Sequence, residues 1–130
     1  MKMTSKVLFV DDDDNILSVF KRRFRKHFDV HFASGGKEGL ELLGSKGPFA
    51  VVVSDLRMPN LDGIQFLGEV KKYAPGTVRI MLTGIPSQTL ATDSVTAGYI
   101  FRFHTKPCSF QNLYNSINEG IEEHQGSVAM

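Results

Sequence analysis

The chain has 130 residues, of which 42% are hydrophobic and 22% are charged. This length favours one compact domain with its own core, and this composition excludes an extended disordered or fibrous protein. Fifteen Lys and Arg against fourteen Asp and Glu leave a formal charge of +1, which gives no strong attraction for nucleic acid or an anionic membrane. We therefore expect a single domain that binds neither of them.

Cysteine content and apolar runs indicate the compartment. The single cysteine, Cys108, cannot form an internal disulfide, and the four histidines show no zinc-ligand spacing. No apolar run reaches the roughly 20 residues that span a bilayer, and the run Val7–Val10 is too short for the core of a signal peptide. We expect a soluble, cytoplasmic protein.

Five short apolar runs alternate with stretches of helical period. This alternation is typical of βαβ units around a parallel sheet, and several runs are apolar enough for burial on both faces. The sequence therefore predicts an α/β fold of the (βα)5 type, with a doubly wound, five-stranded parallel sheet. The strand candidates are Val7–Val10, Val30–Ala33, Ala50–Ser54, Val78–Leu82 and Tyr99–Phe103.

The intervening helices are predicted from apolar spacing and breaker residues. The first carries Ile16, Phe20 and Phe24 on one side; its basic residues, Lys21 to Lys26, are interpreted as a solvated face rather than a nucleic-acid patch. The remaining predictions are a helix from Gly36 to Gly47-Pro48, one after Asp62-Gly63 that ends at Pro75-Gly76, a weak and mobile one over Ser87–Ala97, and a last one that buries Phe110, Leu113, Ile117 and Ile121. The domain is expected to cover residues 1–125, with 126–130 as a disordered tail.

Acidic residues follow the first and third apolar runs. Asp11-Asp12-Asp13-Asp14 comes directly after Val10, and Asp55 follows Ser54. In an open parallel sheet functional groups gather at the carboxyl ends of the strands, so these carboxylates are expected to meet. Their mutual repulsion is relieved by a divalent cation, and hard oxygen ligands without His or Cys favour Mg²⁺. Asp13 and Asp14 are better explained as acids at a helix N-terminus.

Two further side chains are expected at the same edge of the sheet. Thr83 ends the fourth run and Lys106 follows the fifth, which adds a hydroxyl and an ammonium to the carboxylates. Taken alone, Lys106 is typical of a surface lysine and Asp55 of a turn cap. Together they supply what in-line phosphoryl transfer to an aspartate requires: a carboxylate nucleophile and positioned positive charge.

The order of these motifs resembles the response-regulator receiver family of bacterial two-component systems. The matching fragments are Val10-Asp11-Asp12, Asp55-Leu56-Arg57-Met58-Pro59 with Asp62-Gly63, Thr83-Gly84 and Lys106-Pro107. The resemblance covers nearly the whole chain, and the joint placement of the fragments is far more specific than any one of them. It implies a flavodoxin-like sheet with strand order 2-1-3-4-5.

The resemblance also implies roles for individual residues. Asp55 resembles the phosphoacceptor, Asp12 the direct metal ligand and Asp11 its acidic neighbour in the pocket. The backbone carbonyl of Arg57 would be a further ligand of Mg²⁺. Lys106 is similar to the lysine that pairs with the acyl phosphate, and the peptide bond to the following proline is commonly cis in the family.

Two residues resemble the conformational switch of the family. Thr83 looks like the hydroxyl that moves toward the phosphoryl group. Phe103 occupies the place of its aromatic partner, where Tyr is more frequent, so its movement would be governed by packing alone. Core packing is an equally good interpretation of Phe103. The output surface would comprise the fourth helix, the fifth strand and the fifth helix.

The function implied is a signalling domain that catalyses only its own phosphorylation and dephosphorylation. A histidine kinase or phosphotransfer protein would donate the phosphoryl group, and the domain would act on an output domain or protein, with homodimer formation on phosphorylation. Two alternatives remain open. One is a pseudo-receiver that only binds proteins; the other is an aspartate-based phosphohydrolase, which would need a carboxylate where Arg57 stands.

Overall fold

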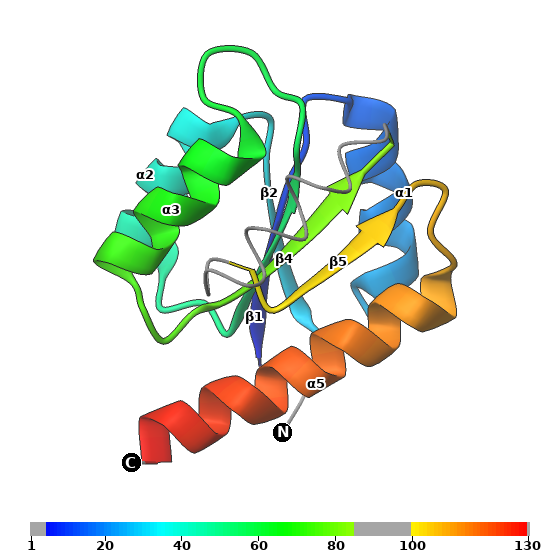
Figure 1. Cartoon of the computed structure of the whole chain (residues 1–130). Helices are drawn as coiled ribbons and strands as arrows, with labels where there is room; N and C mark the ends of the chain where they lie inside the picture. The colour runs from blue at the N-terminus through cyan, green and yellow to red at the C-terminus, as the bar shows by residue number, and fades with distance from the viewer. Residues whose placement is uncertain (1–4, 85–99, 130) are drawn as a thin grey trace.

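The computed structural model describes residues 5–84 and 100–129, which form a parallel sheet between two layers of helices (Figure 1). The strand order is β2-β1-β3-β4-β5, and all pairs are parallel, which confirms the predicted fold class. The strands are β1 (Lys6–Val10), β2 (Asp29–Ala33), β3 (Val51–Asp55), β4 (Val78–Thr83) and β5 (Arg102–Thr105). The helices are α1 (Asp14–Phe24), α2 (Gly36–Lys46), α3 (Gly63–Tyr73) and α5 (Phe110–Ala129).

The core consists of two apolar clusters, one on each face of the sheet. Successive strand residues point to opposite faces, so Val7 and Phe9 join the cluster under α1 and α5, whereas Leu8 and Val10 join the one under α2 and α3. All five residues of β3 are buried. A strand buried on both faces needs a continuous apolar run, which is the pattern that identified β3 in the sequence.

Acidic side chains fix the starts of two helices. Asp13 caps α1, because its carboxylate accepts a hydrogen bond from the backbone N–H of Asn15 at 2.9 Å. Asp62 and Gln65 form a capping box at the start of α3, with reciprocal bonds of 2.8 and 3.1 Å. The expectation that Asp13 serves a helix terminus is therefore confirmed, and α3 begins directly beside the end of β3.

The last strand lies further along the chain than predicted. β5 covers Arg102–Thr105 instead of Tyr99–Phe103, and its pairing with β4 begins at Ile80 opposite Arg102. Ile100 is buried at 3% exposure, but it precedes the paired residues. The apolar pattern thus predicted which residues are buried. It did not predict which residues pair with β4, because that depends on backbone hydrogen bonding. Tyr99 and the helix predicted over 87–97 lie outside the described residues.

The predicted tail is wrong for residues 126–129, because α5 continues to Ala129. The segment has no proline, the residue that would break the helical hydrogen-bond ladder. His124 also joins this part of α5 to the loop before β4, with its Nδ1 2.7 Å from the carbonyl oxygen of Gly76. None of the helices in the described part of the chain has the length and apolar character that crossing a bilayer requires.

We expect Gly63→Ala to lower the free energy of unfolding by about 2 kcal/mol or more, because the new methyl group must displace backbone. A Cβ at Gly63 would overlap the carbonyl oxygen of Asp55 and lie 2.8 Å from the Cα of Leu56. Gly68→Ala, in the same helix, is the control: nothing lies within 4 Å of its Cβ. Helix propensity predicts a gain of about 0.5 to 1 kcal/mol there. Urea unfolding measures both; equal effects would contradict the close approach of α3 to β3.

Candidate functional site: an acidic pocket with a lysine

The carboxyl ends of β1 and β3 bring three acidic side chains together. Asp55 is the last residue of β3, and Asp11 follows β1 directly, at the point where the two strands lie side by side. Carboxylate oxygens of Asp11, Asp12 and Asp55 all lie within 4.8 Å of one another. Asp11 and Asp55 are 2% and 9% exposed, whereas Asp12 is exposed. The structure therefore gathers the acids that the sequence placed at neighbouring strand ends.

Backbone N–H groups hold two of these carboxylates in place. The N–H of Leu56 donates to Oδ1 of Asp55 at 2.9 Å, and the N–H of Asp13 donates to Oδ1 of Asp11 at the same distance. The N–H of Asp11 in turn donates to the carbonyl oxygen of Ala33 at 3.1 Å. These donors leave the second oxygen of each carboxylate for other partners. Sequence reasoning missed them, because the chain folding that aims a backbone N–H is not visible in residue types.

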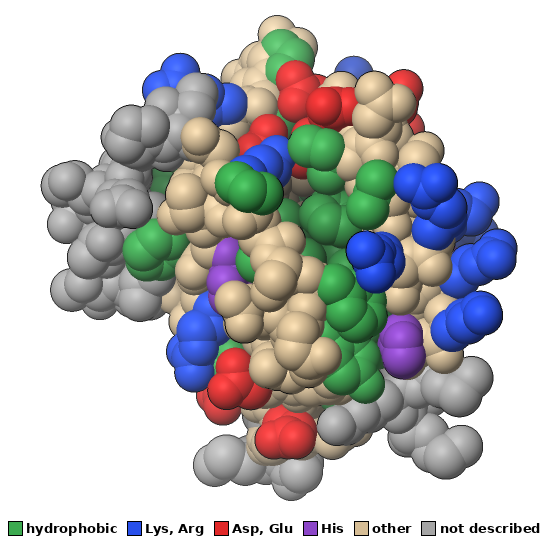
Figure 2. Space-filling view, turned by 90° about the vertical axis from the view of Figure 1, so that its right-hand side faces the viewer, with side chains coloured by type: hydrophobic (Ala, Val, Ile, Leu, Met, Phe, Trp, Pro, Cys, Tyr) green, Lys and Arg blue, Asp and Glu red, His purple; other side chains and the backbone are tan. Residues whose placement is uncertain are grey.

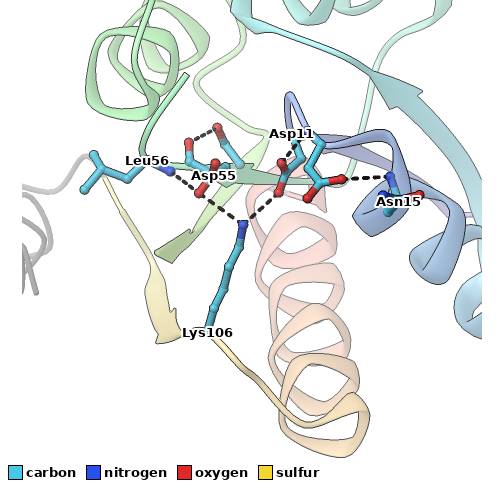
Figure 3. A network of polar contacts seen from close by, with 7 residues as sticks. Asp11, Asn15, Asp55, Leu56 and Lys106 are labelled. Atoms are coloured by element: carbon cyan, nitrogen blue, oxygen red, sulfur yellow. Dashed lines mark hydrogen bonds and ion pairs between the residues drawn. The ribbon is translucent and has the colours of Figure 1, made fainter. Parts of the chain in front are cut away.

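Lys106 joins the two buried carboxylates (Figure 3). Its Nζ donates to Oδ2 of Asp11 at 2.9 Å and forms an ion pair with Oδ1 of Asp55 at 3.3 Å. The backbone N–H of Lys106 donates to the carbonyl oxygen of Thr83 at 2.7 Å, which fixes the residue at the end of β4. The peptide bond between Lys106 and Pro107 is cis.

Burial and charge shift the pKa values in this pocket. Desolvation and the neighbouring charge of Asp11 raise the pKa of Asp55, and the positive charge of Lys106 offsets only part of this effect. Burial alone would lower the pKa of Lys106, but its bonds and charge interactions with Asp11 and Asp55 raise it overall. Lys106 therefore stays charged, while the ionised form of Asp55 is held at a cost.

The remaining predicted residues surround this group. Thr83 ends β4 at 1% exposure, next to the strand of Asp55. Phe103 is half-buried and packs against the apolar cluster on the α2 and α3 side, as expected for a core residue. The exposed residue Arg57 lines, together with Asp12, a shallow hollow of about 460 Å³. A metal-binding role for the backbone carbonyl of Arg57 stays a prediction, as does the movement of Thr83 and Phe103.

An apolar groove beside Lys106 was not foreseen. It has a volume of about 520 Å³ and is lined by Ile16, Val19 and Phe20 of α1 together with Pro107 and Cys108. Figure 2 shows the side of the molecule that carries α1, where hydrophobic side chains form a band between basic and acidic groups. Val19 is 41% exposed, unlike most large apolar residues of the chain. A single exposed valine in a helical pattern gave no signal of this groove.

Comparisons with known proteins agree with this architecture. A family model described as the response regulator receiver domain matches residues 7–118. The transcriptional regulatory protein GlrR of Escherichia coli K12 is 36% identical over 118 residues, which cover 90% of this chain and 26% of GlrR. The regulatory protein AtoC of the same organism is 31% identical over 123 residues, covering 94% and 26%. The chain thus spans about a quarter of the length of these curated relatives.

Solved structures show the same fold. One described as an adenylate cyclase from Rhodopirellula baltica has a TM-score of 0.94 at 32% identity, covering 97% of this chain and 93% of the other. A response regulator receiver domain protein from Clostridium thermocellum has a TM-score of 0.87 at 31% identity, covering 97% and 99%. This chain belongs to the response regulator receiver domain family, whose function is to accept a phosphoryl group.

The raised pKa of Asp55 predicts that Asp55→Asn is more stable than the wild type at pH 7. A folded-state pKa above the ordinary value of 3.8 means that the ionised carboxylate is less favourable in the folded than in the unfolded chain. The advantage of the variant should be complete above the raised pKa and shrink as the pH falls toward 3.8. Thermal unfolding from pH 3.5 to 7.5 measures it, and an advantage that grows on acidification would contradict the assigned shift.

Proposed function

We propose that Asp55 accepts a phosphoryl group from the phosphohistidine of a histidine kinase or phosphotransfer protein, and that the resulting aspartyl phosphate switches an output surface. The observation that carries this proposal is the convergence of Asp11, Asp12 and Asp55, two of which, Asp11 and Asp55, contact Lys106 Nζ. One ammonium cannot neutralise three carboxylates, so the pocket has a deficit of positive charge. A site of this kind suits a divalent cation together with a phosphoryl group.

The residues account for the transfer step. A carboxylate oxygen of Asp55 attacks phosphorus, the phosphorus–nitrogen bond to the donor imidazole breaks, and its electron pair stays on that nitrogen. The partly desolvated carboxylate of Asp55 is a better nucleophile than one in water, consistent with its raised pKa. The ammonium of Lys106 lies 3.3 Å from the attacking carboxylate and can neutralise the incoming phosphoryl oxygens.

The donor set of the pocket fits Mg²⁺. Asp12 and Asp55 supply hard oxygen ligands, Asp11 supports them from beside the pocket, and the backbone carbonyl of Arg57 is the proposed further ligand. Because Asp12 is exposed, an ion held here would be open to solvent, and water or phosphate oxygens would complete its ligands. When bound, the ion would supply charge neutralisation for the phosphoryl oxygens.

The switch is proposed to start at Thr83. Its hydroxyl, buried at the end of β4, would close on a phosphoryl oxygen, and Phe103 would repack in the apolar cluster below. This would bias an equilibrium between two states of the surface formed by β5, α5 and residues 87–97. Residues 87–97 lie outside the described part of the chain.

Membership of the family suggests three kinds of partner, which we propose for this chain. We propose a cytoplasmic domain that receives its phosphoryl group from another protein, acts on an output domain or protein, and pairs with a second copy when phosphorylated. The apolar groove beside Lys106 offers a donor protein a surface next to the reacting atoms. The pocket itself argues against a pseudo-receiver, since binding alone does not require three converging carboxylates.

We expect Asp55→Ala to abolish phosphorylation by acetyl phosphate and Mg²⁺, because it removes the nucleophile. Phos-tag electrophoresis should show a shifted band for the wild type and none for the variant. Asp14→Ala is the matched control, since Asp14 is an exposed acid in the first turn of α1 outside the pocket. It should shift like the wild type. A shifted band that persists in Asp55→Ala would remove Asp55 from its role.

Magnesium affinity should depend on Asp12. We expect Asp12→Ala to weaken Mg²⁺ binding by about tenfold or more, because it removes a charged oxygen ligand. Isothermal titration calorimetry measures the affinity. Asp14→Ala is again the control, because it removes a carboxylate that lies outside the pocket. Equal affinities for the wild type and Asp12→Ala would show that the ion is held elsewhere.

A further inference from the structure

His104 is a half-buried residue of β5 that faces α5. Its neighbour Phe103 packs on the α2 and α3 side of the sheet, whereas the Nε2 of His104 lies 2.7 Å from Oγ of Ser116 in α5. Ser116 is only 5% exposed, and Leu113 and Ile117 on either side of it belong to the apolar cluster. A buried hydroxyl such as that of Ser116 is costly without a hydrogen-bond partner, and His104 supplies one.

His104 lies two residues before Lys106, the cation of the acidic pocket. Lys106 is anchored through its backbone N–H to Thr83, and its Nζ reaches 2.9 Å to Asp11 and 3.3 Å to Asp55. A lysine can bridge two carboxylates only while its backbone stays at the right place relative to them. His104 contacts α5 just before this residue, so the contact bears on where the backbone of Lys106 lies.

The surroundings of His104 disfavour a positive charge. Burial lowers the pKa of His104 below its ordinary value of 6.5, the charge of Arg102 lowers it further, and Glu119 on α5 offsets part of the effect. Arg102 and Glu119 also form an ion pair with each other, with 3.9 Å between Nε and Oε1. On β4, Ile80 and Leu82 share this face of the sheet, and both are apolar and buried. The lowered pKa thus favours the neutral imidazole, and acidification shifts the balance toward the protonated form.

We propose that His104 is a positioning residue for phosphoryl transfer, which acts through Lys106 and is controlled by a proton. The neutral imidazole pairs with the hydroxyl of Ser116 and holds β5 against α5. Protonation places a second cation beside Arg102, and the repulsion between them loosens β5 from α5 and withdraws Lys106 from the carboxylates. The inference rests on the proposed role of Asp55 and adds a loss of phosphorylation at acidic pH.

The test compares the pH dependence of phosphorylation in the wild type and in His104→Gln. The glutamine amide can still bond to Ser116, but it does not titrate. With acetyl phosphate and Mg²⁺ as the probe, the ratio of the His104→Gln rate to the wild-type rate should be near one at pH 8. It should rise to about two where half of His104 is protonated, and toward about ten one pH unit lower. The ratio cancels pH effects on the donor and on Asp55.

Two controls separate the outcomes. His124→Gln makes the same substitution at a half-buried histidine that bonds to the loop before β4, and its profile should follow the wild type. Nuclear magnetic resonance of the His104 ring in the wild type should give a titration midpoint at the pH where the ratio of the two rates reaches two. Parallel profiles for the wild type and His104→Gln, with the ring titrating in the same range, would overturn the inference.

Failure of the proposed function would look different, because the wild type would then show no phosphorylation even at pH 8. Should His104→Gln not fold, Ser116→Ala takes its place. This variant keeps the titratable ring but removes its partner, so its rate should already be several-fold lower at pH 8. A wild-type rate in Ser116→Ala at that pH, measured on folded protein, would also overturn the role of the pair.

Discussion

The contact between Lys106 and the carboxylates of Asp11 and Asp55 determines how the rest of the pocket can be built. Two almost buried anions side by side repel each other strongly, because a low local dielectric screens little of their interaction. One ammonium relieves this repulsion, but with Asp12 included the pocket still holds three acids against one base. The pocket of the folded chain therefore has an excess of negative charge. Such an excess is a property of a cation-binding site rather than of a structural ion pair.

The parallel sheet is the reason that such a group can exist. Its members come from positions 11, 55, 83 and 106, which are far apart in the chain but follow strands that all run in one direction. Helices α1, α2 and α3 return the chain to the opposite edge, and all five strands run in one direction, so each strand ends at the same edge of the sheet. Packing of the apolar strands thus keeps the carboxylates close together, although their mutual repulsion would drive them apart.

Much of this arrangement could be predicted from the sequence, because burial leaves a pattern that is local in the chain. The apolar runs identified β1, β3 and β4 to within one residue at either end, and their final residues identified the acidic pocket. The register of β5 could not be read in this way, since it depends on backbone pairing with β4. The contact of His104 with Ser116 was equally invisible, because it joins two elements whose separation is fixed only by the packing of α5.

The course of α5 has a consequence for anything attached beyond it. The helix starts near the carboxyl ends of the strands, where the acidic pocket lies, and runs toward the amino ends (Figure 1). There His124 contacts the loop that precedes β4. The first residues of β1 lie at that same end. A protein that docks on the phosphoacceptor and a module joined after Ala129 would thus approach from opposite poles, so neither would need to make way for the other.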